Sequence, residues 1–151
     1  MRSNALVLSA LAAVLAGSSM ASPPAGKPAP GMATLVAADE MKWVEVPGTP
    51  AKMAAAKGDS AKGAHESFIK LPAGFSAPLH SHTADHEVAV VSGTLLLTPE
   101  GGAAKKLGPG SWFEFTGKKK HVTACEAGAD CVLFVVSKGA WDLVPADAPK
   151  K

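Results

Sequence analysis

Three histidines, His80, His82 and His86, fall within seven consecutive positions of this sequence. His80 and His82 are two residues apart, so in an extended strand their side chains project from the same face. Two imidazoles placed in this way can bind one metal ion. His86 follows after a short polar loop, and His121 is the next histidine along the chain. Residue type and spacing therefore predict a metal site.

The segments that must position these histidines are short and rich in β-forming residues. Proline and glycine separate them, as is typical of strands joined by turns. This pattern predicts an antiparallel barrel or sandwich. Residues 49–63 contain an alanine and lysine run and are interpreted as a loop. The expected strand regions are Met41–Val46, Glu66–Leu71, Glu87–Leu97 and Ser111–Phe115.

The stretch around the clustered histidines resembles the first motif of the cupin superfamily. That motif runs from a glycine through five residues to His-x-His, then to a glutamate and a closing glycine. Gly74, His80, His82 and Gly93 match it in type and spacing. The departure is at the acidic position, where this chain has His86 in place of glutamate.

Glu87 follows His86 directly, and the two residues compete for the position of the third ligand. Neighbouring residues of a strand face opposite sides, so both cannot point at one ion. With His86 inward, Val88 and Val90 also point inward and fill a barrel interior. The opposite choice leaves an apolar inner set too. The count of residues to the closing glycine favours His86, and Glu87 stays as the alternative.

A second cupin-like motif lies further along the chain. Gly110 and His121 match its first glycine and its histidine in spacing. Thr116, Lys118 and Cys125 stand where the family has proline, glycine and asparagine. This half is therefore degraded, and the resemblance depends on the two motifs together, over residues 41–143.

The resemblance implies an all-β cupin double-stranded β-helix, a jelly-roll-like antiparallel barrel in a single domain. It also implies one divalent transition metal, which the sequence leaves open as Fe, Cu, Ni, Mn or Zn, with affinity favouring Cu and Zn. A homodimer is a further expectation from the family. The implied metal ligands are His80, His82, His86 or Glu87, and His121.

Two classes of function are compatible with such a site. The first is a small metal-dependent enzyme, with oxygenase-, lyase- or isomerase-like activity on a small organic substrate, in which Glu87 is the candidate general base. The second is a non-catalytic cupin that binds metal or a small ligand as a sensor or carrier. The chain has no tyrosine, which excludes cupin chemistries that depend on a tyrosine base or a Cys-Tyr crosslink.

The first residues have the features of a secretory signal peptide. One basic residue precedes an apolar run from Ala5 to Ala16, and small residues precede a cut after Ala21. The run is short for a membrane span, which needs about 20 residues. We therefore expect a signal peptide at 1–21, a flexible Pro/Ala-rich leader at 22–40, a barrel at 41–145 and a polar tail at 146–151. The mature protein is expected to be periplasmic or secreted, with no membrane attachment.

The charge and arginine content of the chain indicate that nucleic acid is not among its partners. The net charge is +2 and the only arginine is Arg2, so the expected mature domain lacks the cationic surface that nucleic-acid recognition requires.

Cys125 and Cys131 enclose a turn-like sequence, and in an exported protein they predict a disulfide across a hairpin. The alternative is a Cys125 thiolate near the metal. His65 alternates with apolar residues in an expected strand and is interpreted as a hydrogen-bonded structural histidine.

Overall fold

The computed structural model of the chain describes residues 31 and 33–146. The predicted signal peptide and most of the predicted leader and tail lie outside these residues. Within the described part all regular structure is β-strand, so it contains no helix long and apolar enough to cross a membrane. Residues from Val36 onward form one compact unit, and the strands lie between Val44 and Pro145.

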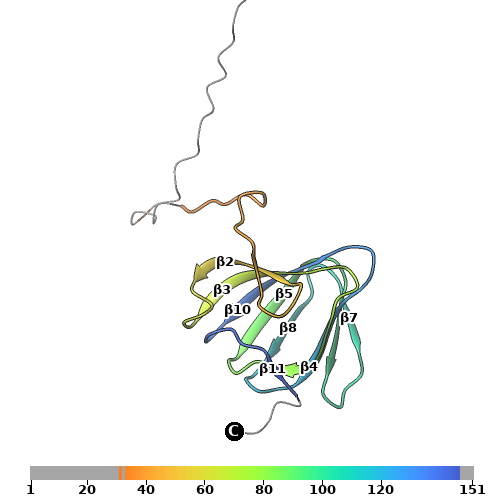
Figure 1. Ribbon diagram of the computed structural model, residues 1–151. Coiled ribbons are helices and arrows are strands. Elements are labelled where there is room, and N and C mark those ends of the chain that lie inside the picture. Colours follow the sequence, from red (N-terminus) through yellow and green to blue (C-terminus); the bar gives the residue numbers. More distant parts are fainter. Residues whose placement is uncertain (1–30, 32, 147–151) are drawn as a thin grey trace, which may run out of the picture. The chain divides into compact units, whose positions relative to one another are not determined.

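The strands form two antiparallel sheets that face each other (Figure 1). The six-stranded sheet has the order β1-β2-β3-β10-β5-β8, and the five-stranded sheet has the order β11-β4-β9-β6-β7. Neighbouring strands are often distant in sequence, as in a jelly roll. The first sheet contains β1 (Val44–Glu45), β2 (Lys52–Gly58), β3 (His65–Leu71), β10 (Cys131–Ser137), β5 (His86–Ser92) and β8 (Trp112–Phe115). The second contains β11 (Val144–Pro145), β4 (Ser76–Ser81), β9 (His121–Cys125), β6 (Leu95–Pro99) and β7 (Lys105–Leu107).

Strict alternation of buried and more exposed residues gives the barrel its core. In β3 every second residue from His65 to Leu71 is buried, and β10 follows the same pattern from Cys131 to Val135. A strand with this period presents one apolar face to the interior. The largest fully buried apolar side chains are Leu95, Val90 and Val135. The expected all-β antiparallel barrel is therefore confirmed.

The interpretation of residues 49–63 as a loop is wrong, because β2 occupies Lys52–Gly58. Alanine and lysine have weak strand preference, but pairing with β3 decides the conformation. Met53 and Ala54 are buried by this pairing, while the second half of the strand is exposed. The strand thus extends the six-stranded sheet rather than closing a surface loop.

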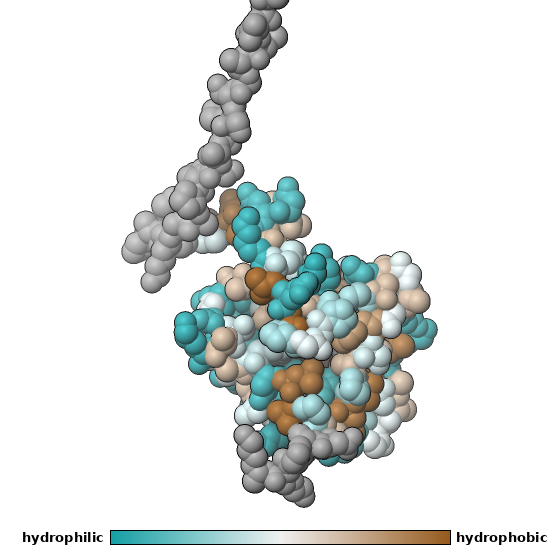
Figure 2. Space-filling view, viewed as in Figure 1, coloured by the Kyte–Doolittle hydropathy of each residue, from teal (hydrophilic) through white to brown (hydrophobic). Residues whose placement is uncertain are grey.

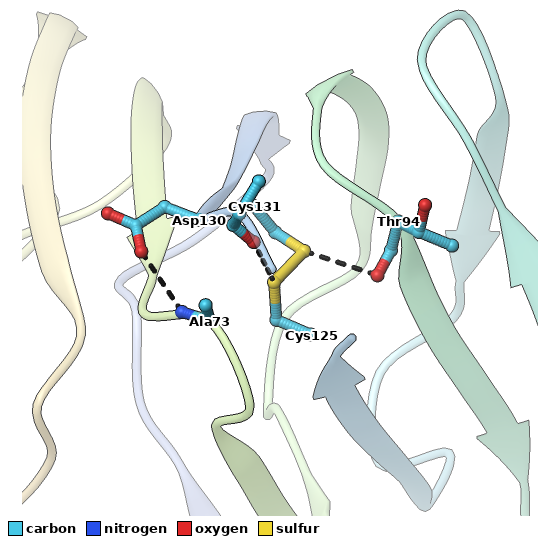
Figure 3. The surroundings of a disulfide bond; sticks show 6 residues. Ala73, Thr94, Cys125, Asp130 and Cys131 are labelled. Carbon is cyan, nitrogen blue, oxygen red and sulfur yellow. Dashed lines mark hydrogen bonds between the residues drawn. A yellow bond between two sulfur atoms is a disulfide. The ribbon is translucent and has the colours of Figure 1, made fainter. Parts of the chain in front are cut away.

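Cys125 and Cys131 form a disulfide, as predicted, with Cα atoms 5.8 Å apart (Figure 3). The alternative of a Cys125 thiolate near a metal is therefore wrong. Sγ of Cys131 lies 3.3 Å from the carbonyl oxygen of Thr94, and the Asp130 carboxylate accepts a hydrogen bond from the Ala73 amide at 3.0 Å. The bond joins the end of β9 to the start of β10 and so ties the two sheets together.

Several apolar side chains remain at the surface of the unit. Trp112 on the edge strand β8 is 56% exposed, and Val91 on β5 is 49% exposed. Figure 2 shows hydrophobic residues in brown among hydrophilic ones in teal on one face of the molecule. Isolated exposed apolar residues are ordinary on soluble domains.

Candidate metal centre

Three inward-facing strands position the clustered histidines. His80 lies in β4 directly opposite His121, the first residue of β9. The register of β4 shifts between Ala77 and His80. In a regular strand, residues three positions apart face opposite sides, so this irregularity is what allows Ala77 and His80 both to be buried. His82 follows the end of β4 and shares the face of His80. His86 begins β5.

The side chains converge in the barrel interior. One ring nitrogen from each of His80, His82 and His121 lies within 4.8 Å of the others, a group that could hold a metal ion. The ring of His86 is close as well, with its centroid 4.7 Å from that of His82 and 6.0 Å from that of His121. All four histidines are buried. The structure therefore brings together the four histidines that the sequence singled out.

Hydrogen bonds fix the tautomer of each ring. Nδ1 of His80, His86 and His121 lies 2.7, 3.2 and 3.1 Å from the carbonyl oxygen two residues earlier in the chain. Nδ1 of His82 contacts the carbonyl oxygen of Asp142. A carbonyl can only accept, so each Nδ1 carries the hydrogen and each Nε2 keeps its lone pair. Neutral imidazoles oriented by a second partner are the usual form of histidine ligands.

Burial keeps the four rings uncharged. It lowers the pKa of His82 to about 3 and that of His121 to about 4, and it lowers the pKa of His80 and His86 as well. Neighbouring histidines lower the pKa values of His82 and His121 further, because protonated rings would repel one another. At neutral pH the cluster therefore offers lone pairs rather than positive charge.

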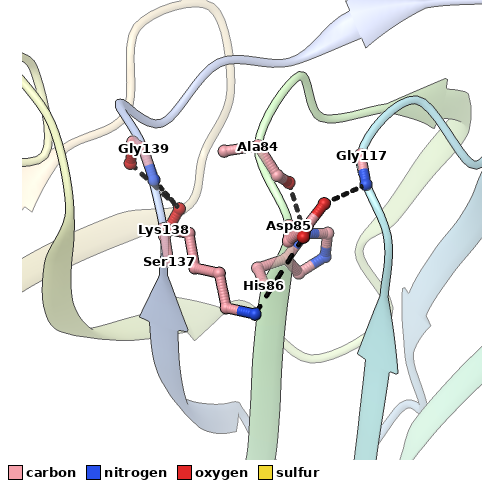
Figure 4. A network of polar contacts seen from close by, with 7 residues as sticks. All are labelled: Ala84, Asp85, His86, Gly117, Ser137, Lys138 and Gly139. Atoms are coloured by element: carbon pink, nitrogen blue, oxygen red, sulfur yellow. Dashed lines mark hydrogen bonds and ion pairs between the residues drawn. The ribbon is translucent and has the colours of Figure 1, made fainter.

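The loop between β4 and β5 is braced from two sides (Figure 4). The Asp85 carboxylate accepts a hydrogen bond from the Gly117 amide at 2.7 Å and faces the Lys138 ammonium at 4.0 Å. A Cβ atom at Gly117 would collide with the carbonyl oxygen of Thr83, so only glycine allows this approach. The brace holds His86 and the end of β4 in fixed relation.

A segment after β10 completes the site, and no sequence motif indicated it. The Trp141 ring packs on His82 with centroids 4.1 Å apart, and its amide donates to the carbonyl oxygen of Ser60 at 2.7 Å. The Asp142 carboxylate accepts hydrogen bonds from the amide and hydroxyl of Thr83, at 2.8 and 2.5 Å. We call residues 139–145 the strap. It orients His82 through both Trp141 and Asp142.

Two further candidates lie apart from the cluster. His86 faces inward with Val88 and Val90, as expected, so Glu87 lies on the other face of β5, half-buried and opposite Glu114. A catalytic role of Glu87, and the ligand role of His86, stay predictions. His65 is buried with Nδ1 3.0 Å from the carbonyl oxygen of Gly63, as expected for a structural histidine.

A cavity of about 80 Å³ opens beside the histidine cluster. Apart from the four histidines, its walls are apolar side chains and two threonines, Thr49 and Thr123. The apolar wall comes from both sheets and from the strap. It is made by Val46, Ala51, Ile69, Leu71, Phe75, Ala77, Val88, Phe113, Leu133, Val135, Trp141 and Leu143.

Residues 25–144 match the family described as "Domain of unknown function (DUF4437)". The chain belongs to this family. No protein with a curated description matches the DUF4437 chain significantly in sequence. The cupin fold that its two histidine motifs predicted is confirmed by solved structures of the same fold.

Several solved structures resemble this DUF4437 domain. The polyketide cyclase RemF from Streptomyces resistomycificus has a TM-score of 0.64 and 21% identity, over 79% of this chain and 89% of that one. An RmlC-like cupin from Shewanella frigidimarina has a TM-score of 0.56 and 18% identity, over 71% and 92%. The DMSP lyase DddQ from Ruegeria pomeroyi has a TM-score of 0.60 and 17% identity, over 75% of this chain but only 64% of its own length. At such identities the likeness establishes the fold alone.

Proposed function

We propose that this protein is an exported, metal-dependent cupin enzyme that acts on a small organic substrate. The observation that carries the proposal is the convergence of His80, His82 and His121 at the end of an apolar cavity. Their Nδ1 hydrogen bonds leave the Nε2 lone pairs for an ion. Export is supported by the signal-like first residues and by the disulfide.

The donor set fits a divalent transition metal. Three or four neutral imidazoles suit Zn, Cu, Fe, Ni or Mn, whereas Mg and Ca prefer oxygen ligands. A bound ion would supply Lewis-acid chemistry or, if redox-active, activation of oxygen. A shell of three protein ligands leaves a position open for substrate, which is the arrangement of catalytic rather than structural sites.

The chain's own residues would bind and orient the substrate. The cavity walls exclude water from the reacting atoms, and Trp141 fixes the ring of His82 beside them. The His86 ring lies next to His82 but outside the group of three. Its unprotonated Nε2 could then accept a proton from a bound substrate, if it is not itself a ligand.

Relatives of the same fold support an enzyme over a carrier, because the similar structures include a cyclase and a lyase. If the protein is instead a carrier or sensor, it needs the same histidines, and a turnover assay distinguishes it from an enzyme. In that case the protein would hold metal but turn over no member of a panel of small carbonyl and hydroxyl compounds.

Elemental analysis of the protein purified from the periplasm, without a histidine tag, tests the proposal. We expect about one transition-metal ion per chain. His82→Ala should lose it, because this substitution removes one of the three grouped ligands. His65→Ala is the matched control and should keep it, because His65 hydrogen-bonds to the backbone outside the group. Full metal in both variants, or none in the parent after reconstitution, would contradict the proposal.

A further inference from the structure

No charged side chain is among the described residues that line the cavity beside the histidines. Among the described lining residues, the polar groups besides the histidines are the hydroxyls of Thr49 and Thr123 and the indole N–H of Trp141, and the Thr49 hydroxyl is already engaged. The Thr49 hydroxyl donates to the carbonyl oxygen of Val46 at 3.1 Å and accepts from the Ala51 amide at 3.2 Å. The remaining hydrogen-bonding capacity therefore lies at the four histidines, at Trp141, which packs on His82, and at Thr123, which lies two residues after His121 in β9.

The acidic residues nearest the histidines are turned toward other partners. Asp85 accepts from the Gly117 amide and faces Lys138. Asp142 accepts from the amide and hydroxyl of Thr83. A charged or many-hydroxyl molecule in the cavity would lose its hydration and find few groups to replace it, which costs several kcal/mol per unpaired group.

We infer that the ligand of this cavity is a small neutral molecule with an apolar body and one oxygen function directed at the histidines. This inference deepens the proposed function, since it names the substrate class of the same site. A volume of about 80 Å³ is roughly half that of an engineered cavity of about 150 Å³ that admits benzene. A short branched chain or a five-membered ring enters it, and a longer molecule extends through the mouth.

Specificity then follows from the walls rather than from hydrogen bonds. Phosphorylated sugars, dicarboxylates and free amino acids are rejected, because a charged group away from the histidines finds no charged side chain among the described lining residues to pair with. Sites that recognise an apolar body discriminate by shape and size. Phe113 and Leu133 belong to this wall.

The test uses metal-free protein and three probes with the same number of heavy atoms, namely cyclopentanone, butyrate and dihydroxyacetone. Binding is followed by amide chemical-shift changes in NMR titrations. We expect cyclopentanone to bind at least tenfold more tightly than either polar probe. Equal or tighter binding of butyrate or dihydroxyacetone would overturn the inference.

A pair of variants locates the binding. Ala77→Leu fills the cavity, because Ala77 is buried in its wall, and should weaken cyclopentanone binding at least tenfold. Ala89→Leu is the matched control, because Ala89 lies on the opposite face of β5 from Val88, and should bind as the parent does. If Ala77→Leu does not fold, shift changes confined to amides of cavity-lining residues in the parent decide the same point.

The outcome is separable from that of the proposed function. Cyclopentanone binding by a protein that takes up no metal would sustain this inference and refute the metal-dependent enzyme. Metal uptake together with preference for butyrate or dihydroxyacetone would do the reverse.

Discussion

The buried neutral histidines predict that the metal-free protein loses stability in mild acid. The pKa of His82 is about 3 and that of His121 about 4 in the folded state, whereas both have about 6.5 in the unfolded chain. Because folding lowers both pKa values, the two neutral histidines make their full contribution to the free energy of unfolding above pH 6.5. This contribution is lost as the pH falls toward 4. In that window the unfolded chain binds protons that the folded protein cannot.

The magnitude follows from the number of protons. Each ring that is charged only in the unfolded state lowers the free energy of unfolding by about 1.4 kcal/mol per pH unit. Below pH 6, His82 and His121 together lower the free energy of unfolding by about 3 kcal/mol for each pH unit. The lowered pKa values of His80 and His86 act in the same direction. Typical domains have a total stability of about 5 to 15 kcal/mol. A single pH unit therefore removes a large part of it.

Guanidinium unfolding of the metal-free protein at pH 7, 6 and 5, followed by tryptophan fluorescence, measures this loss. His121→Phe serves as the internal comparison, because a phenyl ring preserves the stacking on Phe115, whose ring lies 4.2 Å from that of His121. The variant should show a slope smaller by about 1.4 kcal/mol per pH unit. A stability that stays constant between pH 7 and pH 5 would refute the reasoning from burial.

Two further predictions concern the disulfide and the ligand count. Replacing Cys125 and Cys131 by serine should lower the free energy of unfolding by about 2 kcal/mol, since the closed loop is short. Elemental analysis should show an unchanged metal content. Loss of the metal would mean that the disulfide supports the site. His86→Ala should retain metal with reduced affinity in a competition titration against a chelator, because His80, His82 and His121 alone form the close group in the described residues. Complete loss of metal in this variant would make His86 an essential fourth ligand.

Much of the site could be predicted from sequence because its signals are local. The His-x-His spacing places two rings on one strand face whatever surrounds them, and the expected export favours a disulfide between nearby cysteines. β2 could not be predicted, because Ala54 and Ala55 have no strand preference of their own and follow the pairing with β3. The strap could not be predicted from the sequence for a related reason. Its contact with His82 joins residues 60 positions apart, and no local pattern encodes it.

That long-range contact gives the strap a role in the timing of maturation. His80 and His82 are synthesised well before Trp141 and Asp142, so the growing chain has the first ligands without the carbonyl that orients His82. A metal ion that meets the unfinished chain finds rings free to turn and to bind through either nitrogen. The selective geometry arises only after the strap has docked beside β4. Selective metal loading should therefore follow folding, because before the strap docks the rings can bind an ion without the orientation that Asp142 gives His82.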